Sequence, residues 1–525
     1  MNGAMRAYRI LWVDDEIDLL RPHIIFLEKK GCIVRPTTNG DDAIHYVQRE
    51  SFDLVLLDEM MTGRDGLSTL EEIKTISSSL PVIMITKSED ERLMDQAIAK
   101  RIDDFLIKPL NPVQVYTACR RLLEKGHIRE TTLAGEFAKG FADLERNRQF
   151  AQSTGDWIKL ANQLAEWDLR LDASSDDAMK QSQRDHRNAC NVDFVHFIES
   201  NYRSWLDGVD PPAMSVDLVR NYVAPHLKAG RRIALIIIDG MRLDQWLALE
   251  SLIRPFYNIR REDYLAILPT ATPYARNAIF SGLFPGEIAS RYPQYWPNAT
   301  AEETSRNRYE KELLTELLRR LGLRLRKGIY YQKIFNASEA ETVRRARAQM
   351  ITHELTTLVY SFVDILTHGR SHSEILKEIV PDESALRSLT RSWFSHSALF
   401  DLMKDLSEKE IMVVVTSDHG SILSLRATRV YGNKDTSTNV RYKYGRNLGC
   451  NERHAIHLKH PKDFRLPTDN LVTDYIIAKE DYYFVYPTRY REFEKQYYGG
   501  FQHGGISMDE MILPVAVLSP IQGGG

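Results

Sequence analysis

Short, strongly apolar runs alternate with amphipathic stretches over residues 1–125. Each run is bounded by acidic residues, glycine or proline, as buried parallel strands are, and the runs are RILWV, DLVLL, PVIMI and DFLI. Cys32–Arg35 is a candidate for one more strand. The alternation of such strands with amphipathic stretches predicts a doubly wound α/β domain built on a five-stranded sheet.

The middle of the chain has the periodicity of helices. Val113–Asp210 contains no proline. Apolar residues recur there at alternating steps of three and four. This spacing places five side chains on one helix face, namely Trp157, Leu160, Leu164, Trp167 and Leu171. We interpret residues 126–212 as a helical bundle or linker with these side chains in its core. Pro211-Pro212 marks its boundary.

Strand-like runs return over residues 213–525, where we find RIALIII, IMVVV and MILPVAVL. The first run leads at once to Asp239, and the second leads within a few residues to Asp418. Ligands of open α/β sheets gather at the carboxyl ends of the strands. Residues 213–525 are therefore expected to form a further α/β domain with a site at its strand ends.

Composition sets limits on this picture. A chain of 525 residues suits roughly three domains. No apolar run approaches the ~20 residues that cross a bilayer, and the N-terminus lacks the apolar core of a signal peptide, so we expect a cytoplasmic protein without membrane insertion. The four cysteines form no CxxC pair, which leaves Asp, His and hydroxyl groups as metal ligands. The net charge of −3 gives no general attraction to nucleic acid.

Polar groups end four of the strands predicted in residues 1–125, and these groups are Asp14-Asp15, Asp58, Thr86 and Lys108. In a parallel sheet they converge on one edge. Carboxylates packed together need a hard cation, and Mg²⁺ prefers such oxygen ligands. The cation also lets a carboxylate attack a phosphoryl donor, while an ammonium and a hydroxyl group can bind the phosphoryl oxygens.

With these residues in this order, residues 7–125 resemble the receiver domain of bacterial response regulators, which has a flavodoxin-like fold. The resemblance implies that Asp58 accepts a phosphoryl group from a sensor histidine kinase and that Mg²⁺ is held by Asp14, Asp15 and Asp58. It further implies that Thr86 and Lys108 contact the phosphoryl group and that Lys108-Pro109 is a cis peptide. Phe105 stands at the position of the family's switch aromatic residue.

The last domain carries a second set of polar residues with metal-binding chemistry. They follow strand-like runs, stand at a turn or lie on a helix, and are Asp239, Thr270, Thr272, Asp364, His368, Asp418, His419 and His503. Asp364 and His368, four residues apart, can face one ion from one helix. Two Zn²⁺ ions about 4 Å apart can clamp the oxygens of a phosphoryl transfer. A threonine at a helix N-terminus can then act as the nucleophile.

This order of residues resembles the alkaline phosphatase superfamily, and within it the PglZ branch, over residues 215–520. Carried over by position, the resemblance implies one zinc on Asp239, Thr272, Asp418 and His419, and a second on Asp364, His368 and His503. Thr272 is then the nucleophile. Thr270 is the only close rival, and the spacing to Gly282 favours Thr272. Sulfatases of this superfamily need Cys or Ser at that position, which argues against sulfatase activity.

Two features have open interpretations as substrate contacts. Arg276 lies four residues after Thr272 and either touches a substrate phosphate or is a surface helix charge. Residues 426–447 interleave arginine, lysine and tyrosine and either cover a nucleotide substrate as a lid or form a solvated loop. The lid residues with candidate substrate contacts are Arg441, Tyr442, Lys443 and Arg446.

The order of the three regions resembles that of the PorX-type family of response regulators, which are linked to type IX secretion. The resemblance implies zinc-dependent hydrolysis of phosphodiesters, including short linear or cyclic oligonucleotides. Implied partners are the sensor kinase, a sigma factor and the secretion apparatus. Phosphorylation of Asp58 would change the surface near Phe105 and favour a homodimer, and the helical middle would carry the change to the hydrolase.

A second hypothesis is a signalling adaptor, in which the zinc domain binds a sigma factor or a secretion protein and hydrolysis is incidental. A DNA-binding regulator is a weaker alternative, because no DNA-reading helix is evident and sequence-specific DNA binding is therefore not expected.

Overall fold

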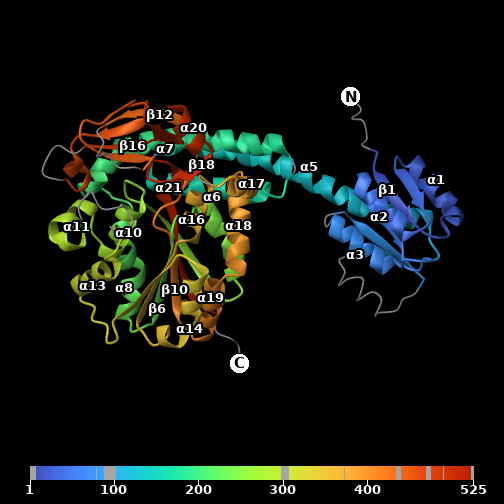
Figure 1. Ribbon diagram of the computed structural model, residues 1–525, viewed down its shortest axis with the longest axis horizontal. Coiled ribbons are helices and arrows are strands. Elements are labelled where there is room, and N and C mark those ends of the chain that lie inside the picture. The colour runs from blue at the N-terminus through green and yellow to red at the C-terminus, as the bar shows by residue number, and fades with distance from the viewer. Residues whose placement is uncertain are drawn as a thin grey trace. The chain divides into compact units, whose positions relative to one another are not determined.

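The protein is described by a computed structural model that covers residues 7–77, 80–87, 102–174, 176–296, 307–371, 373–432, 439–468, 474–488 and 490–521. The chain forms two compact units, Met1–Lys139 and Gly140–Gly525, whose elements are labelled in Figure 1. Among the helices of these residues, none combines the length and the apolar character that crossing a membrane requires.

The first unit contains a parallel sheet with the strand order β2-β1-β3-β4-β5. Its strands are β1 (Arg9–Val13), β2 (Ile33–Thr37), β3 (Leu54–Asp58), β4 (Val82–Thr86) and β5 (Asp104–Ile107). Alternate side chains face opposite sides, because the side-chain period of a strand is two. Ile10 packs in one apolar cluster and Leu11 in the other. The prediction of a doubly wound, five-stranded domain is confirmed.

Helices cover both faces of this sheet. Ile24 of α1 (Arg21–Lys29) and Val115 of α5 (Pro112–Phe150) belong to one apolar cluster. Ala43 of α2 (Gly40–Arg49) and Leu70 of α3 (Gly66–Ile76) belong to the other. The strands are buried on both faces, which explains why their sequences are nearly all apolar.

The helical prediction for the middle of the chain is confirmed. Beyond α5 the chain forms α6 (Thr154–Leu171) and α7 (Asp177–Leu206). Ser153 caps α6 in a reciprocal pair with Asp156, which satisfies backbone groups at the helix start. Trp157 is buried and packs edge-on against Phe194 of α7. Both helices belong to the same compact unit as the last domain, where α6 packs against α9.

The second unit is built on a sheet with the strand order β7-β19-β10-β6-β9-β8. Its strands are β6 (Ile233–Ile238), β7 (Tyr257–Leu265), β8 (Ile329–Ile334), β9 (Leu355–Tyr360), β10 (Met412–Thr416) and β19 (Ile512–Pro520). The strands β8, β9, β6 and β10 are parallel, whereas β19 runs antiparallel to both of its neighbours. The sequence predicted β6, β10 and β19, and the structure adds the other three.

The second unit also contains the following helices. They are α8 (Ala224–Lys228), α9 (Leu243–Ile253), α10 (Thr272–Ser281), α11 (Pro285–Arg291), α13 (Glu310–Arg320), α14 (Ala337–Arg345), α15 (Arg347–Met350), α16 (Phe362–Arg370), α17 (Glu374–Ile379), α18 (Glu383–Ser395), α19 (Ala398–Glu408), α20 (Tyr490–Tyr497) and α21 (Met508–Met511). Gly282 ends α10 with φ of 59°, a left-handed conformation that glycine adopts without strain.

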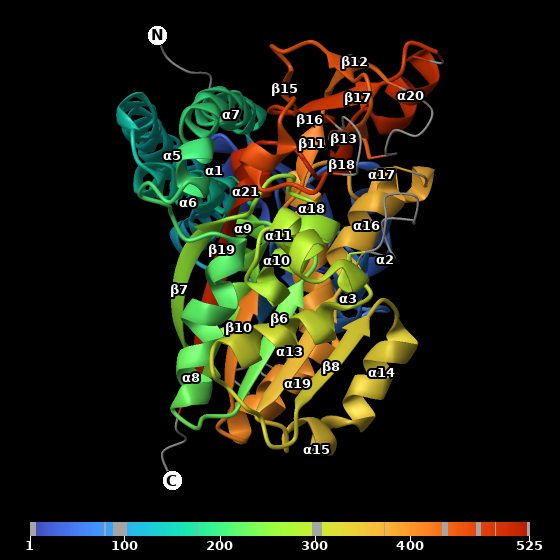
Figure 2. The same cartoon turned by 90° about the vertical axis from the view of Figure 1, so that its left-hand side faces the viewer.

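Three small sheets fill the long segment between β10 and β19. They pair β11 (Ile422–Ser424) with β18 (Gly500–Gln502), β12 (Arg426–Tyr431) with β14 (Gly449–Cys450) and β17 (Tyr482–Val485), and β16 (Asp474–Ala478) with β13 (Tyr442–Gly445) and β15 (Ala455–Leu458). Figure 2 shows these strands gathered beyond one end of the central sheet.

Candidate functional site

The strand ends of the first unit bring an acidic cluster together. Asp14 follows β1, Asp58 ends β3, and Lys108 follows β5. Carboxylate oxygens of Asp14, Asp15 and Asp58 lie within 4.8 Å of one another. The Lys108 Nζ lies 2.9 Å from Asp14 Oδ2 and 3.0 Å from Asp58 Oδ1. Burial and the charge of Asp14 raise the pKa of Asp58 to about 6, against the opposing effect of Lys108. The three carboxylates carry more negative charge than the one lysine neutralises, and this excess suits a divalent cation.

The remaining receiver residues lie around this cluster. Asp15 is exposed and accepts hydrogen bonds from the backbone N–H and the hydroxyl of Thr62, at 3.1 and 3.0 Å. Thr86 is buried at the end of β4, and Phe105 lies on β5 with 39% of its surface exposed. The Lys108-Pro109 peptide is cis, as the family resemblance implied.

We expect Asp58→Asn to abolish phosphorylation of the chain by acetyl phosphate. The amide cannot form the acyl phosphate, while its similar volume preserves the buried end of β3. Intact-protein mass spectrometry should detect one added phosphoryl group on the wild type and none on the variant. Asp53→Asn, just before the same strand, is a matched control and should be phosphorylated like the wild type. Equal incorporation into Asp58→Asn would contradict this assignment.

In the second unit, the sequence-predicted residues meet at one end of the central sheet. Asp239 follows β6, Asp418 and His419 follow β10, and Thr272 begins α10. Asp364 and His368 lie on α16, which follows β9, and His503 follows β18. Parallel strands bring their carboxyl ends to one edge, which explains this convergence from sequence positions far apart.

His419 is the centre of a first group. Its Nε2 lies 2.9 Å from Thr272 Oγ1, 3.6 Å from Asp239 Oδ1 and 3.8 Å from Asp418 Oδ2. Asp239, Asp418 and His419 are all buried, whereas Thr272 is half-buried. The hydroxyl of Thr272 is therefore the accessible member of this group.

A second group contains Asp364, His368 and His503. The Nε2 atoms of His368 and His503 lie 2.9 Å apart, and Asp364 Oδ1 lies 3.3 and 3.6 Å from them. The rings of His419 and His503 stack with their centroids 4.0 Å apart, so the two groups adjoin. His368 is exposed, which places it with Thr272 on the open side of the site.

Backbone carbonyls fix the orientation of two imidazoles. His419 Nδ1 lies 3.0 Å from the carbonyl of Gly420, and His503 Nδ1 lies 3.3 Å from the carbonyl of Thr270. Because a carbonyl only accepts, each Nδ1 is the donor, and Nε2 is the nitrogen that faces the site. Burial and the neighbouring histidines hold the pKa of His503 well below its usual value, so this ring is neutral, which is the form that binds metal.

Several carboxylate oxygens of this site have no hydrogen-bond partner within the part of the chain that the structure describes. Among the described residues, no hydrogen-bond donor reaches the buried atoms Asp239 Oδ1, Asp364 Oδ1 and Asp418 Oδ2. Buried carboxylate oxygens without a donor are costly. Burial raises the pKa of Asp239 to about 7, whereas the nearby histidines lower that of Asp364 despite its burial. A set of imidazole nitrogens and carboxylate oxygens fits divalent metal ions of the zinc type.

Comparison with known families gives this unit its classification. The family model of the BREX system PglZ alkaline phosphatase-like domain matches residues 218–518, which is more than half of the chain. The chain belongs to the PglZ alkaline phosphatase-like family. The response regulator receiver domain matches residues 10–120, and the PorX response regulator linker domain matches residues 127–206. The chain therefore has the domain order of PorX-type response regulators.

Individual relatives match the receiver region. The transcriptional regulatory protein ResD of Bacillus subtilis is 33% identical over 117 residues, which are 22% of this chain and 48% of ResD. The regulatory protein VanRc of Enterococcus gallinarum is 30% identical over 143 residues, 26% of this chain and 62% of VanRc. A CheY-like receiver protein of Methanospirillum hungatei is 24% identical, with 23% and 95% of the two chains covered and a TM-score of 0.22. The chain thus spans less than two thirds of the length of ResD and of VanRc.

The structure corrects the surface-charge interpretation of Arg276 in the PglZ domain. Its guanidinium is buried beside the proposed ligands Asp239 and Asp418. Nη1 lies 2.5 Å from Asp239 Oδ2 and 3.5 Å from Asp418 Oδ2, and Nε donates to Glu310 at 2.8 Å. Arg276 therefore neutralises buried carboxylates and orients Asp239.

The solvated-loop interpretation of residues 426–447 is wrong for Arg441 and for β13, which are buried. The Arg441 guanidinium is fully buried and pairs with Glu510, at 3.1 Å from Nε and 2.5 Å from Nη2. Tyr442 is also buried, and the Lys443 Nζ lies 5.1 Å from the centre of the Tyr486 ring. Tyr442 also packs edge-on against Tyr274 of α10, with the ring centroids 5.5 Å apart. Arg446 is exposed, and residues 433–438 lie outside the described residues.

Sequence reasoning missed several residues that support the PglZ site. Ser361 donates to Asp239 Oδ2 at 3.2 Å, and it directly follows β9, so the strand-end rule could have found it. Glu310 receives Arg276 and also the Lys333 Nζ at 3.1 Å. The sequence around Glu310 does not predict its role, because its partners lie far away in sequence.

Proposed function

We propose that this chain is a response regulator whose PglZ domain hydrolyses phosphoesters with Thr272 as the nucleophile. One observation carries the proposal. The accessible Thr272 hydroxyl begins α10 and lies 2.9 Å from His419 Nε2, beside three buried carboxylate oxygens that lack hydrogen-bond donors. This combination suits a nucleophile held in a metal centre.

Two zinc ions fit the donors. Asp239, Thr272, Asp418 and His419 would hold one, and Asp364, His368 and His503 would hold the other. When bound, the ions supply positive charge that lowers the pKa of a hydroxyl group and neutralises the transferred phosphoryl group.

The residues of the chain then perform a two-step displacement. Thr272 Oγ1 attacks phosphorus, an alcohol leaves, and a phosphothreonine ester forms. Water hydrolyses this ester, which restores the Thr272 hydroxyl and releases the phosphate product. The positive end of the α10 dipole favours the phosphate at this position. The carbonyl of Gly420 holds Nδ1 of His419, which keeps Nε2 on the side of the Thr272 hydroxyl, where both would bind the same ion.

We further propose that the substrates are phosphodiesters, including short linear or cyclic oligonucleotides, and that phosphorylation of Asp58 by a sensor histidine kinase controls the activity through a homodimer. The match to the PorX linker domain supports a role in type IX secretion with a sigma factor and the secretion apparatus as partners. We place the protein in the cytoplasm, where such kinases donate their phosphoryl groups.

We expect metal removal to abolish hydrolysis and to lower the melting temperature. At free zinc of about 100 times Kd, binding stabilises the fold by about 2.7 kcal/mol. The measurement is hydrolysis of a chromogenic phosphodiester and its monoester, with thermal melting, after chelation and after zinc is returned. Zinc near two per chain and faster diester turnover are expected.

A ligand variant gives the matched control for this test. Asp418→Asn removes a buried ligand of one ion and should reduce the melting response to zinc, whereas Asp401→Asn on the exposed side of α19 should keep the full response. If the wild type binds no metal and cleaves neither ester, the proposal fails. A Thr272→Val protein without hydrolysis but with full signalling in cells would instead favour the adaptor hypothesis.

A further inference from the structure

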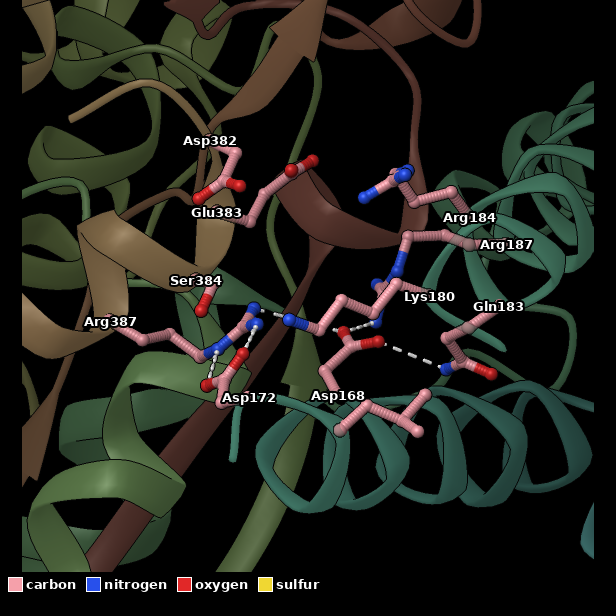
Figure 3. A pocket seen from close by; sticks show the side chains of 11 residues that line it. Asp168, Asp172, Lys180, Gln183, Arg184, Arg187, Asp382, Glu383, Ser384 and Arg387 are labelled. Carbon is pink, nitrogen blue, oxygen red and sulfur yellow. Dashed lines mark hydrogen bonds and ion pairs between the residues drawn. The ribbon is translucent and has the colours of Figure 1, made fainter. Parts of the chain in front are cut away.

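A buried charge network joins the linker helices α6 and α7 to the loops that carry the proposed metal ligands. Figure 3 shows its outer part. Asp168 of α6, Asp172 at the C-terminal end of α6 and Arg187 of α7 lie there beside Arg387 of α18. The network adjoins a polar cavity of about 100 Å³. All of these residues belong to the second compact unit.

Arg242 is the inner end of this network. It lies three residues after Asp239, and its side chain is 2% exposed. Nε and Nη2 each donate to Asp244 at 3.0 Å, Nη2 donates to Asp509 at 3.2 Å, and Nη1 donates to the carbonyl of Ser421 at 3.3 Å. Arg242 thus binds the loop after β10 and the turn of α21 in addition to its own loop.

One arm leads from Arg242 to α7. Asp509, which receives Arg242, also receives the Arg187 Nη1 at 2.6 Å. Asn191, one helical turn further along α7, donates to Asp509 at 3.3 Å. Arg187 in turn pairs with Asp168 of α6. A single carboxylate therefore connects a linker helix with the residue that braces the ligand loops.

A second arm leads to α6. Asp244 receives the Arg387 Nη1 at 2.8 Å, and Arg387 pairs with Asp172 at 2.5 Å through Nη2 and 2.8 Å through Nε. Asp244 is 3% exposed, and Asp172 is 26% exposed. The arm therefore runs from the rim of the cavity to the buried Arg242.

The loops that end on this network carry four of the proposed ligands. Asp239 precedes Arg242, Asp418 and His419 precede Ser421, and His503 precedes α21. Backbone packing adds to the charges, because Gly420 donates to the carbonyl of Glu510 at 3.1 Å. A Cβ on Gly420 would lie 1.9 Å from the Asp509 carbonyl oxygen, so the two segments touch without a side chain between them.

We propose that Asp172 and Arg187 are positioning residues through which the linker helices set the geometry of the ligand loops at the hydrolase site. Buried charges tolerate little change in separation, because a broken pair leaves an unneutralised charge in the interior. A shift of α6 or α7 therefore moves Arg242 and the loops together rather than one at a time. The consequence for metal binding rests on the proposed function, whereas the consequence for the loops does not.

The experiment compares full-length Asp172→Asn and Arg187→Lys with wild type. Arg184→Gln is the matched control, because Arg184 is an exposed arginine of α7 that hydrogen-bonds Gln181 of its own helix. Amide hydrogen exchange is followed in metal-free protein for peptides covering residues 239–242, 418–421 and 503–510. Zinc affinity is then measured by competition with a chromogenic chelator.

Both linker variants are expected to speed exchange in the ligand loops and to weaken zinc binding by about 10-fold, as loss of groups that orient metal ligands does. Arg184→Gln should match the wild type. Unchanged loop exchange in folded variants overturns the inference, and so does faster exchange that extends equally over β6 and β9, which indicates general destabilisation. If Arg187→Lys does not fold, the test rests on Asp172→Asn, because position 172 is half-exposed and tolerates substitution better. Faster loop exchange with no zinc binding by the wild type would sustain the inference and refute the proposed metal site.

Discussion

Thr272→Val should lower kcat/KM for phosphodiester hydrolysis by at least about 10³-fold, because it removes the proposed nucleophile and leaves the other proposed ligands in place. Valine has nearly the volume of threonine, and the hydroxyl it replaces is half-buried with a hydrogen bond to His419. The fold should therefore persist, with a melting temperature close to that of the wild type. The measurement is steady-state turnover of a chromogenic diester at saturating zinc.

Two control variants make this result specific. Thr272→Ser keeps a hydroxyl and should retain measurable turnover. Thr270→Val removes a hydroxyl that is fully buried, donates to the Gly505 carbonyl at 2.7 Å and accepts from the Gly504 N–H at 3.2 Å. It should lose stability while the folded fraction keeps its chemistry. Wild-type turnover in Thr272→Val would remove Thr272 from the mechanism.

The strand-end rule explains why much of both sites could be predicted from the sequence. Asp58 and Asp239 end or directly follow runs that are apolar on every position, and such runs are recognisable because both faces of their strands are buried. Parallel pairing then brings polar groups at the ends of these strands to one edge. The rule needs no knowledge of loop structure, so it held in both units.

The same rule could not predict the edge strands or the buried charged residues. β7 has the sequence YNIRREDYL and β8 has IYYQKI, and both are outermost strands whose charged residues obscure their apolar pattern. Arg441 looked exposed because its neighbours are basic and aromatic. Its partner Glu510 lies 69 residues away, and no local pattern predicts such a pairing.

The same limit applied to Arg276, whose replacement carries the largest expected loss of stability. Arg276→Met keeps the length of the side chain but removes the cation between Asp239, Glu310 and Asp418, all of which are buried. Breaking a buried pair on one side leaves an uncompensated charge and typically costs about 3–5 kcal/mol. Urea unfolding of the metal-free proteins measures this loss. Arg254→Met is the matched control. The Arg254 side chain is 69% exposed where it pairs with Glu250, so this variant should stay within about 1 kcal/mol of wild type.

The response to a second substitution separates a positioning role from a substrate contact. Glu310→Gln in the Arg276→Met background removes one of the carboxylates that Arg276 no longer neutralises. It should recover part of the lost stability, because the two groups are coupled. Lys333 pairs with Glu310 and loses this partner in the double variant, so recovery is expected to be incomplete. In the same variants zinc affinity should fall, since Asp239 is no longer oriented, while KM at saturating zinc changes little. A stable Arg276→Met protein with a raised KM and unchanged zinc affinity would instead restore Arg276 as a contact to the substrate phosphate.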